Sequence, residues 1–187
     1  MRIICYGDSN TYGYEPGSYI GGRYKADSRW VDIISAKTGW HFENEGLNGR
    51  TIPCHGINIS DDTDLLLVML GTNDLLQGGT IQNITKKMEH FLLGLQIKKE
   101  KILLIAPPPM KVGLWVPSEE LATDSTGLAA SYCNLAKQLG IHFADSGRWN
   151  ISMTFDGVHF SAEGHRAFAE GLYHFLCNNA ELNEQIT

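Results

Sequence analysis

Short runs of apolar residues alternate along the chain with longer segments in which apolar residues recur every three or four positions. A short apolar run bounded by turn residues is typical of a strand covered on both faces, and the longer spacing is typical of an amphipathic helix. The predicted strands are residues 2–6, 41–45, 64–70, 101–106 and 141–144. The predicted helices are residues 28–38, 81–97, 118–139 and 161–177.

This alternation of strands and helices predicts an α/β domain with a mainly parallel sheet. The chain has 187 residues, which is close to the usual size of one domain, and it contains no internal repeat, linker or low-complexity stretch. We therefore expect residues 1–187 to form a single domain, a three-layer sandwich in which helices cover both faces of the sheet.

The charge and composition exclude several classes of partner. The formal net charge of −6 provides no broad basic surface for nucleic acid or anionic lipid. No apolar run approaches the roughly 20 residues of a membrane span, and the N-terminus enters a predicted strand at once, so we expect a cytoplasmic protein. The cysteines are scattered without metal-ligand spacing, and we expect reduced, mostly buried thiols at Cys5, Cys54, Cys133 and Cys177.

Polar residues follow the predicted strands, at the edge of a parallel sheet where loops form ligand sites. Ser9 follows the first strand in the turn Gly-Asp-Ser. A serine hydroxyl needs a base to become a nucleophile, and the base needs a third group to fix its tautomer. His159 precedes the last predicted helix, and Asp156 lies three positions earlier, a spacing that lets its carboxylate reach Nδ1 of the imidazole. Each feature alone is also common in ordinary turns.

Candidate donors for a developing oxyanion lie in two other loops. The side-chain amide of Asn73 follows the third predicted strand, where it can donate to a carbonyl oxygen that gains charge. Gly49 has no Cβ, so its backbone N–H can approach the same oxygen. We expect Asp74 to cap the following turn and Asn48 to be an ordinary turn residue.

Four segments in this order resemble the signature blocks of the SGNH hydrolases, also called GDSL hydrolases. The blocks are Gly7-Asp8-Ser9, Gly49 in Gly-Leu-Asn-Gly-Arg-Thr, Gly71-Thr72-Asn73-Asp74 and Asp156-x-x-His159. The resemblance spans nearly the whole chain and implies the flavodoxin-like fold of that family. It implies that Ser9 is the nucleophile, His159 the base and Asp156 its orienting partner. It also implies an oxyanion hole formed by the Ser9 and Gly49 N–H groups with the Asn73 amide.

The first two blocks look most like those of the arylesterase and acyltransferase branch of the family, a likeness that also suggests a homo-oligomer. Two residues depart from the usual pattern. Asn10 stands where leucine is usual, and Asn48 replaces a frequent serine. Both lie beside the catalytic positions without occupying them, so the triad is intact and the substrate is left open.

Two long loops are candidates for the wall of a substrate pocket. Residues 12–24 and 107–116 carry aromatic side chains, including Tyr14, that can form an apolar surface for a substrate or pack against another subunit. Both interpretations remain open from the sequence. The candidate substrate-binding residues are Asp8, Asn10, Tyr12, Trp115 and Val158.

The resemblance implies hydrolysis of short-chain carboxylic esters through an acyl-enzyme on Ser9, with no metal or organic cofactor and with acyl transfer as a possible side activity. A carbohydrate O-deacetylase using the same triad is an alternative. An alternative of another class is a non-catalytic α/β binding module, because glycine-rich turns after strands also bind phosphate. The chain lacks the common phosphate-binding and dinucleotide-binding motifs, which disfavours that alternative.

Overall fold

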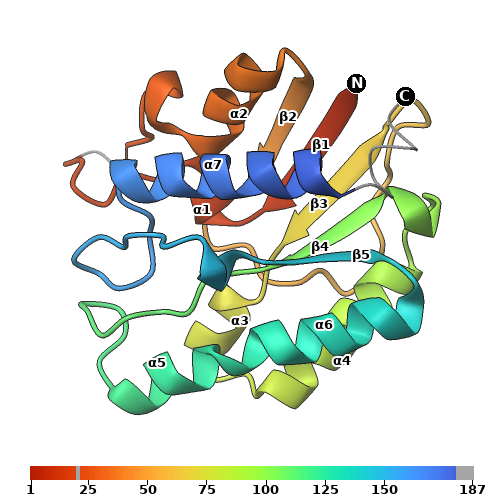
Figure 1. Ribbon diagram of the computed structural model, residues 1–187. Coiled ribbons are helices and arrows are strands. Elements are labelled where there is room, and N and C mark those ends of the chain that lie inside the picture. The colour runs from red at the N-terminus through yellow and green to blue at the C-terminus, as the bar shows by residue number, and fades with distance from the viewer. Residues whose placement is uncertain (20–21, 180–187) are drawn as a thin grey trace.

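A five-stranded parallel sheet forms the centre of the fold in the computed structural model, which describes residues 1–19 and 22–179 (Figure 1). The strand order is β2-β1-β3-β4-β5, and every neighbouring pair is parallel. The strands are β1 (Arg2–Gly7), β2 (His41–Gly46), β3 (Leu65–Met69), β4 (Ile102–Ala106) and β5 (His142–Asp145). Parts of two expectations, residues 20 and 21 of the first long loop and residues 180–187 of the domain, lie outside the described residues.

The central strands are apolar on both faces because helices cover both sides of the sheet. In β1, Ile3 and Cys5 belong to the core on one face, while Ile4 and Tyr6 belong to the core on the other. The alternation follows from the two-residue repeat of a strand. Burial on both faces explains why the sequence shows continuous apolar runs instead of alternating ones.

Helices cover the two faces of the sheet in pairs. Helices α2 (Trp30–Thr38) and α7 (Ala162–Asn178) pack together on one face, and α4 (Ile81–Leu93) and α6 (Gly127–Leu139) pack together on the other (Figure 1). The remaining helices are α1 (Ser9–Tyr12), α3 (Thr72–Leu76), α5 (Glu119–Ser125) and short 3₁₀ turns at Ala26–Ser28, Lys99–Lys101 and Ser146–Arg148. The predicted three-layer α/β architecture is confirmed.

The prediction of one helix over residues 118–139 is wrong, because α5 ends at Ser125 and α6 begins at Gly127. The Ser125 hydroxyl donates to the carbonyl of Ala122 at 2.6 Å and accepts from the backbone N–H of Met110 at 2.8 Å. Side-chain bonds of this kind compete with the regular helical pattern. The partner at Met110 comes from another loop, so the local sequence does not indicate the break.

The structure bears on two expectations from the sequence, one about membrane spans and one about the burial of the cysteines. Across residues 1–19 and 22–179, no helix combines the length and the apolar character that crossing a bilayer requires. The expectation of mostly buried cysteines is wrong: of the four, Cys5 is buried, Cys133 is half-buried, and Cys54 and Cys177 are exposed. The latter two lie in a loop and in the last turn of α7, where the sheet does not cover them.

The strand order places a ligand site between β1 and β3. An order of 2-1-3-4-5 reverses direction at this point, so the loops after the two strands separate and leave a crevice at their carboxyl ends. Helix α1 follows β1 and helix α3 follows β3, while the connection after β2 runs alongside. The segments that carry the candidate catalytic residues are therefore brought to one edge of the sheet.

Candidate active site

Ser9 is held by a tight turn between β1 and α1. A Cβ at Gly7 would lie 2.7 Å from Cβ of Thr11 and 3.0 Å from the carbonyl oxygen of Met69, so only glycine lets α1 fold back over the strand end. Asp8 caps the helix, because its carboxylate accepts the N–H of Asn10 at 2.9 Å. Ser9 is therefore fixed as the first helical residue at the carboxyl edge of the sheet.

His159 and Asp156 meet Ser9 in a chain of hydrogen bonds. Nε2 of His159 lies 3.0 Å from Oγ of Ser9, and Nδ1 lies 2.7 Å from Oδ2 of Asp156. The other carboxylate oxygen, Oδ1, accepts the backbone N–H groups of Val158 and His159 and the hydroxyl of Thr154, each at 2.9 Å. These bonds curl the loop so that the carboxylate reaches back to the imidazole.

The charge of Asp156 decides which nitrogen of His159 carries the proton. Burial alone would raise the pKa of Asp156, but hydrogen bonds from the His159 ring and from the N–H groups of His159 and Val158 lower the pKa to about 2. The carboxylate is therefore ionised at neutral pH and accepts the proton on Nδ1. Nε2 of the neutral imidazole is left to accept the proton of the Ser9 hydroxyl.

The loop of residues 107–116 supports the loop that carries Asp156. The N–H of Lys111 donates to the carbonyl of Gly157 at 2.9 Å, and the N–H of Trp115 donates to the carbonyl of Asp156 at 3.0 Å. Gly157 has a φ of +82°, and a Cβ there would lie 2.0 Å from the Lys111 carbonyl oxygen. This glycine permits both the turn and the close approach of the two loops.

The three residues with candidate oxyanion donors line one cavity. The Ser9 N–H lies in the first turn of α1, where helical N–H groups have no acceptor within the helix. Gly49, with a φ of +72°, borders the same cavity. The Asn73 amide donates one N–H to the carbonyl of Arg50 at 3.0 Å and has a second N–H for an oxygen in the cavity.

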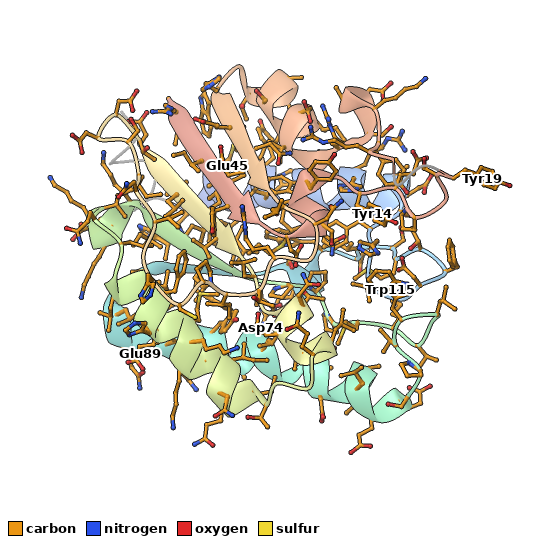
Figure 2. The ribbon with its side chains drawn as sticks, turned by 180° about the vertical axis from the view of Figure 1, so that it is seen from behind. Tyr14, Tyr19, Glu45, Asp74, Glu89 and Trp115 are labelled. Atoms are coloured by element: carbon orange, nitrogen blue, oxygen red, sulfur yellow. The ribbon has the colours of Figure 1, made fainter. Side chains whose placement is uncertain are left out.

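The expectation that Asp74 caps the following turn is wrong, because its carboxylate binds residues of two other segments. Asp74 is buried on α3 (Figure 2), where its carboxylate accepts the N–H of Ile52 at 3.0 Å and pairs with Nζ of Lys87 at 3.1 Å. It therefore attaches the connection after β2, which carries Gly49, to α3.

A cavity of about 230 Å³ opens onto these groups. Its lining consists of Ser9, Tyr14, Asn48, Gly49, Asn73, Trp115 and His159. The Tyr14 and Trp115 rings lie 4.7 and 5.3 Å from the His159 ring, and both residues lie at the same end of the molecule (Figure 2). Each of the two long loops thus contributes one aromatic wall. A larger and shallower hollow along α7 contains none of these residues.

The structure separates the candidate substrate-binding residues into two groups. Trp115 lines the cavity, whereas Asp8, Asn10 and Val158 are buried behind it, and Tyr12 packs against the guanidinium of Arg23. The structure places none of these four in the cavity lining, and their contact with substrate stays a prediction.

Sequence reasoning also missed two residues of the site. Asn48, expected to be an ordinary turn residue, lines the cavity, and its position next to Gly49 was the available signal. Thr154 binds the Asp156 carboxylate, and nothing in its local sequence marks it. For metals, the described ranges contain no group of three or more histidine, cysteine or acidic side chains arranged to hold an ion.

Asp8 gives a test of the electrostatics behind the site. Burial raises its pKa from 3.8 to about 6, and the N–H of Asn10 only partly offsets this. The folded state therefore binds the carboxyl proton of Asp8 more tightly than the unfolded state does. Protonation of Asp8 contributes stability that is fully present below about pH 3.8 and is lost as the pH rises through about 6. The difference corresponds to up to about 3 kcal/mol of unfolding free energy.

We expect Asp8→Asn to be more stable than the unmodified protein at pH 8 and similar to it at pH 4, because an amide oxygen still accepts the Asn10 N–H without a buried charge. Unfolding midpoints of both proteins across this range check the expectation. A stability difference that does not change with pH would show that the Asp8 carboxylate is not the cause.

Comparison with known proteins identifies the family. A model of the GDSL-like Lipase/Acylhydrolase family matches residues 5–167, so the chain belongs to this family within the SGNH/GDSL hydrolases. No curated protein matches the sequence. Solved structures, however, are similar over nearly their whole length.

Three of these structures illustrate the similarity. A carbohydrate acetylesterase family member from Sinorhizobium meliloti is 27% identical, with a TM-score of 0.79 over 97% of this chain and 99% of that one. A proposed arylesterase from Agrobacterium tumefaciens is 26% identical, with a TM-score of 0.77 over 95% and 98%. The aryl esterase of M. smegmatis, 24% identical, has a TM-score of 0.78 over 94% and 98% and shares the fold.

Proposed function

We propose that the protein hydrolyses short-chain carboxylic esters through an acyl-enzyme on Ser9. The observation that carries the proposal is the chain of contacts from Ser9 Oγ to His159 Nε2 at 3.0 Å and from His159 Nδ1 to Asp156 Oδ2 at 2.7 Å. This arrangement supplies an activated nucleophile and an oriented base next to a cavity. Membership of an acylhydrolase family supports the same chemistry.

In the first step, Oγ of Ser9 attacks the carbonyl carbon of the ester while Nε2 of His159 takes the hydroxyl proton. The carbonyl oxygen becomes an oxyanion and accepts hydrogen bonds from the Ser9 and Gly49 N–H groups and the Asn73 amide. The bond between the carbonyl carbon and the alcohol oxygen then breaks, and His159 gives its proton to the leaving alcohol. The acyl group remains on Ser9 as an ester.

In the second step, a water molecule gives a proton to Nε2 of His159 and attacks the acyl carbon. The same donors hold the second oxyanion, which collapses to release the carboxylic acid while the proton returns to Oγ of Ser9. Asp156 remains ionised throughout and stabilises the protonated imidazole. An alcohol that replaces water in this step would give acyl transfer, the side activity that we include in the proposal.

The geometry supports a small acyl group and a leaving group with apolar surface. A cavity of about 230 Å³ limits the combined size of the acyl and alcohol groups that it can enclose. Because His159 must deliver a proton to the leaving oxygen, the alcohol has to lie beside the imidazole. Tyr14 and Trp115 flank that ring, so they offer apolar surface to an aryl or alkyl alcohol.

A panel of p-nitrophenyl esters from acetate to octanoate tests the proposed function. We expect kcat/KM to be greatest for the shortest acyl chains and to fall steeply as the chain lengthens, because the cavity limits the acyl group. The control is Ser9→Ala, which should lose turnover of every ester. Absence of turnover on all esters by the unmodified protein would favour the binding-module alternative, and a rising kcat/KM with chain length would contradict the small acyl site.

A carbohydrate O-deacetylase is the second candidate function, because the S. meliloti structure that is 27% identical is described as a carbohydrate acetylesterase family member. Both candidates use the same triad and differ in the alcohol that leaves. Comparing kcat/KM for aryl acetates with kcat/KM for acetylated oligosaccharides distinguishes them. We expect the aryl acetates to be preferred, and the reverse preference would select the second candidate.

A further inference from the structure

Asn10, the residue after Ser9, binds the backbone on both sides of His159. Its side-chain Nδ2 donates to the carbonyl of Val158 at 3.1 Å, and its Oδ1 accepts the N–H of Phe160 at 2.9 Å. These two peptide groups directly flank His159 in the chain. One buried side chain, 4% exposed, thus connects the turn of the nucleophile to the loop of the base.

Asn10 is itself held firmly in place. Its backbone carbonyl accepts the indole N–H of Trp30 at 3.0 Å, and its own N–H is bound by Asp8 at 2.9 Å. Trp30 is almost fully buried in the core, where its ring packs 4.6 Å from that of Phe168. The connection to His159 therefore starts from a rigid part of the molecule.

The chemistry of the bridge requires an amide. One N–H donor and one oxygen acceptor are needed on a side chain short enough to reach both peptide groups, and asparagine supplies both. Leucine, the residue usual at this position in the resembling family, has neither group. Asp156 orients the imidazole ring of His159 through Nδ1, but it does not connect His159 to the turn that carries Ser9.

We infer that Asn10 is a positioning residue that sets the distance between Ser9 Oγ and His159 Nε2. The inference rests on the proposed function, because that distance matters only if His159 takes the serine proton. Asn10 does not border the cavity, so it acts through His159 and not through the substrate. Misplacement of a catalytic group by about 1 Å can cost about 10²-fold in rate.

Asn10→Leu tests the inference, because it preserves the number and branching of the side-chain heavy atoms and removes both bonds. We expect kcat on p-nitrophenyl acetate to fall by about 10–10²-fold with KM nearly unchanged. The rate of Ser9 inactivation by a sulfonyl fluoride should fall in parallel, since it depends on the same pair of atoms. Asn10→Ser, which cannot reach both peptide groups and leaves space for water, should show the same pattern and serves if the leucine variant does not fold.

Ser146→Ala is the matched control for lost stability. The Ser146 hydroxyl is fully buried and donates to the carbonyl of Ala106 at 2.6 Å, away from the cavity. We expect a lower unfolding midpoint with unchanged kcat and inactivation rate.

The inference is overturned if the folded Asn10 variants keep normal kcat and inactivation rates, or if only their KM changes. The unmodified protein separates this failure from failure of the proposed function. If it neither hydrolyses esters nor reacts at Ser9, the proposed function fails and the inference falls with it.

Discussion

Replacing Asp156 with asparagine is expected to lower kcat by about 10⁴-fold while the protein remains folded. The ionised carboxylate now accepts the proton on Nδ1 of His159 at 2.7 Å. An asparagine amide can donate to Nδ1, which would move the imidazole proton to Nε2 and leave no acceptor for the Ser9 hydroxyl. The amide oxygen can still accept the N–H groups of Val158 and His159, so the turn should persist. Measurement of kcat with p-nitrophenyl acetate and of the unfolding midpoint checks both parts.

Asp145→Asn is the control for this substitution. Asp145 likewise accepts a backbone N–H two residues ahead, that of Gly147 at 3.0 Å, and pairs with the exposed side chain of Arg148. It makes the same kind of turn without contacting a histidine of the site, so kcat should not change. An Asp156→Asn protein with kcat within tenfold of the unmodified protein would remove Asp156 from the proposed role.

Asn73→Ala is expected to lower kcat by about 10²–10³-fold, roughly 2.7–4 kcal/mol, with little change in KM. The side-chain donor strengthens its bond only as the carbonyl oxygen gains charge, so its loss acts on the transition state more than on bound substrate. The variant also loses the bond to the Arg50 carbonyl, which should lower the free energy of unfolding by ~1 kcal/mol. Steady-state kinetics with one short-chain ester measure the effect on kcat. Thermal unfolding of the same protein preparation measures the effect on stability.

Tyr132→Phe provides the comparison for stability alone. The Tyr132 hydroxyl is buried and donates to the carbonyl of Leu70 at 3.1 Å, just before the turn that carries Asn73. Its loss should lower the unfolding midpoint by a similar amount and leave kcat unchanged. If Asn73→Ala behaves like Tyr132→Phe, with a lower midpoint and normal turnover, Asn73 only shapes the turn.

The strands and the edge that carries the site were predictable because they depend on patterns within single segments. Strands β3 and β4 are buried on both faces, and this makes residues 65–70 and 102–106 apolar throughout. In a parallel sheet the carboxyl ends meet at one edge, so Ser9 and Asn73 were expected to be close although 64 positions separate them in the sequence. The proximity of the four blocks follows from the parallel arrangement of the strands.

The direction of individual side chains was not predictable, because it depends on partners distant in the sequence. Asn10 and Val158 are neighbours of candidate catalytic residues, but both are buried, and the Asn10 amide donates to the backbone carbonyl of Val158. Asp74 follows Asn73 in the chain, yet its partner is the N–H of Ile52 in another loop. Adjacency to a candidate catalytic residue in the sequence therefore did not place a side chain in the cavity lining.

Covalent labelling of Ser9 tests the central claim most directly. Only a serine whose proton is taken by an adjacent base should react readily with a phosphonate or sulfonyl fluoride, and the claim is that His159 activates Ser9 in this way. Mass spectrometry of the labelled protein should locate the modification on the peptide that contains Ser9, with loss of labelling in His159→Gln. Modification of Ser28, Ser118 or Ser161 while Ser9 remains unmodified would contradict the account.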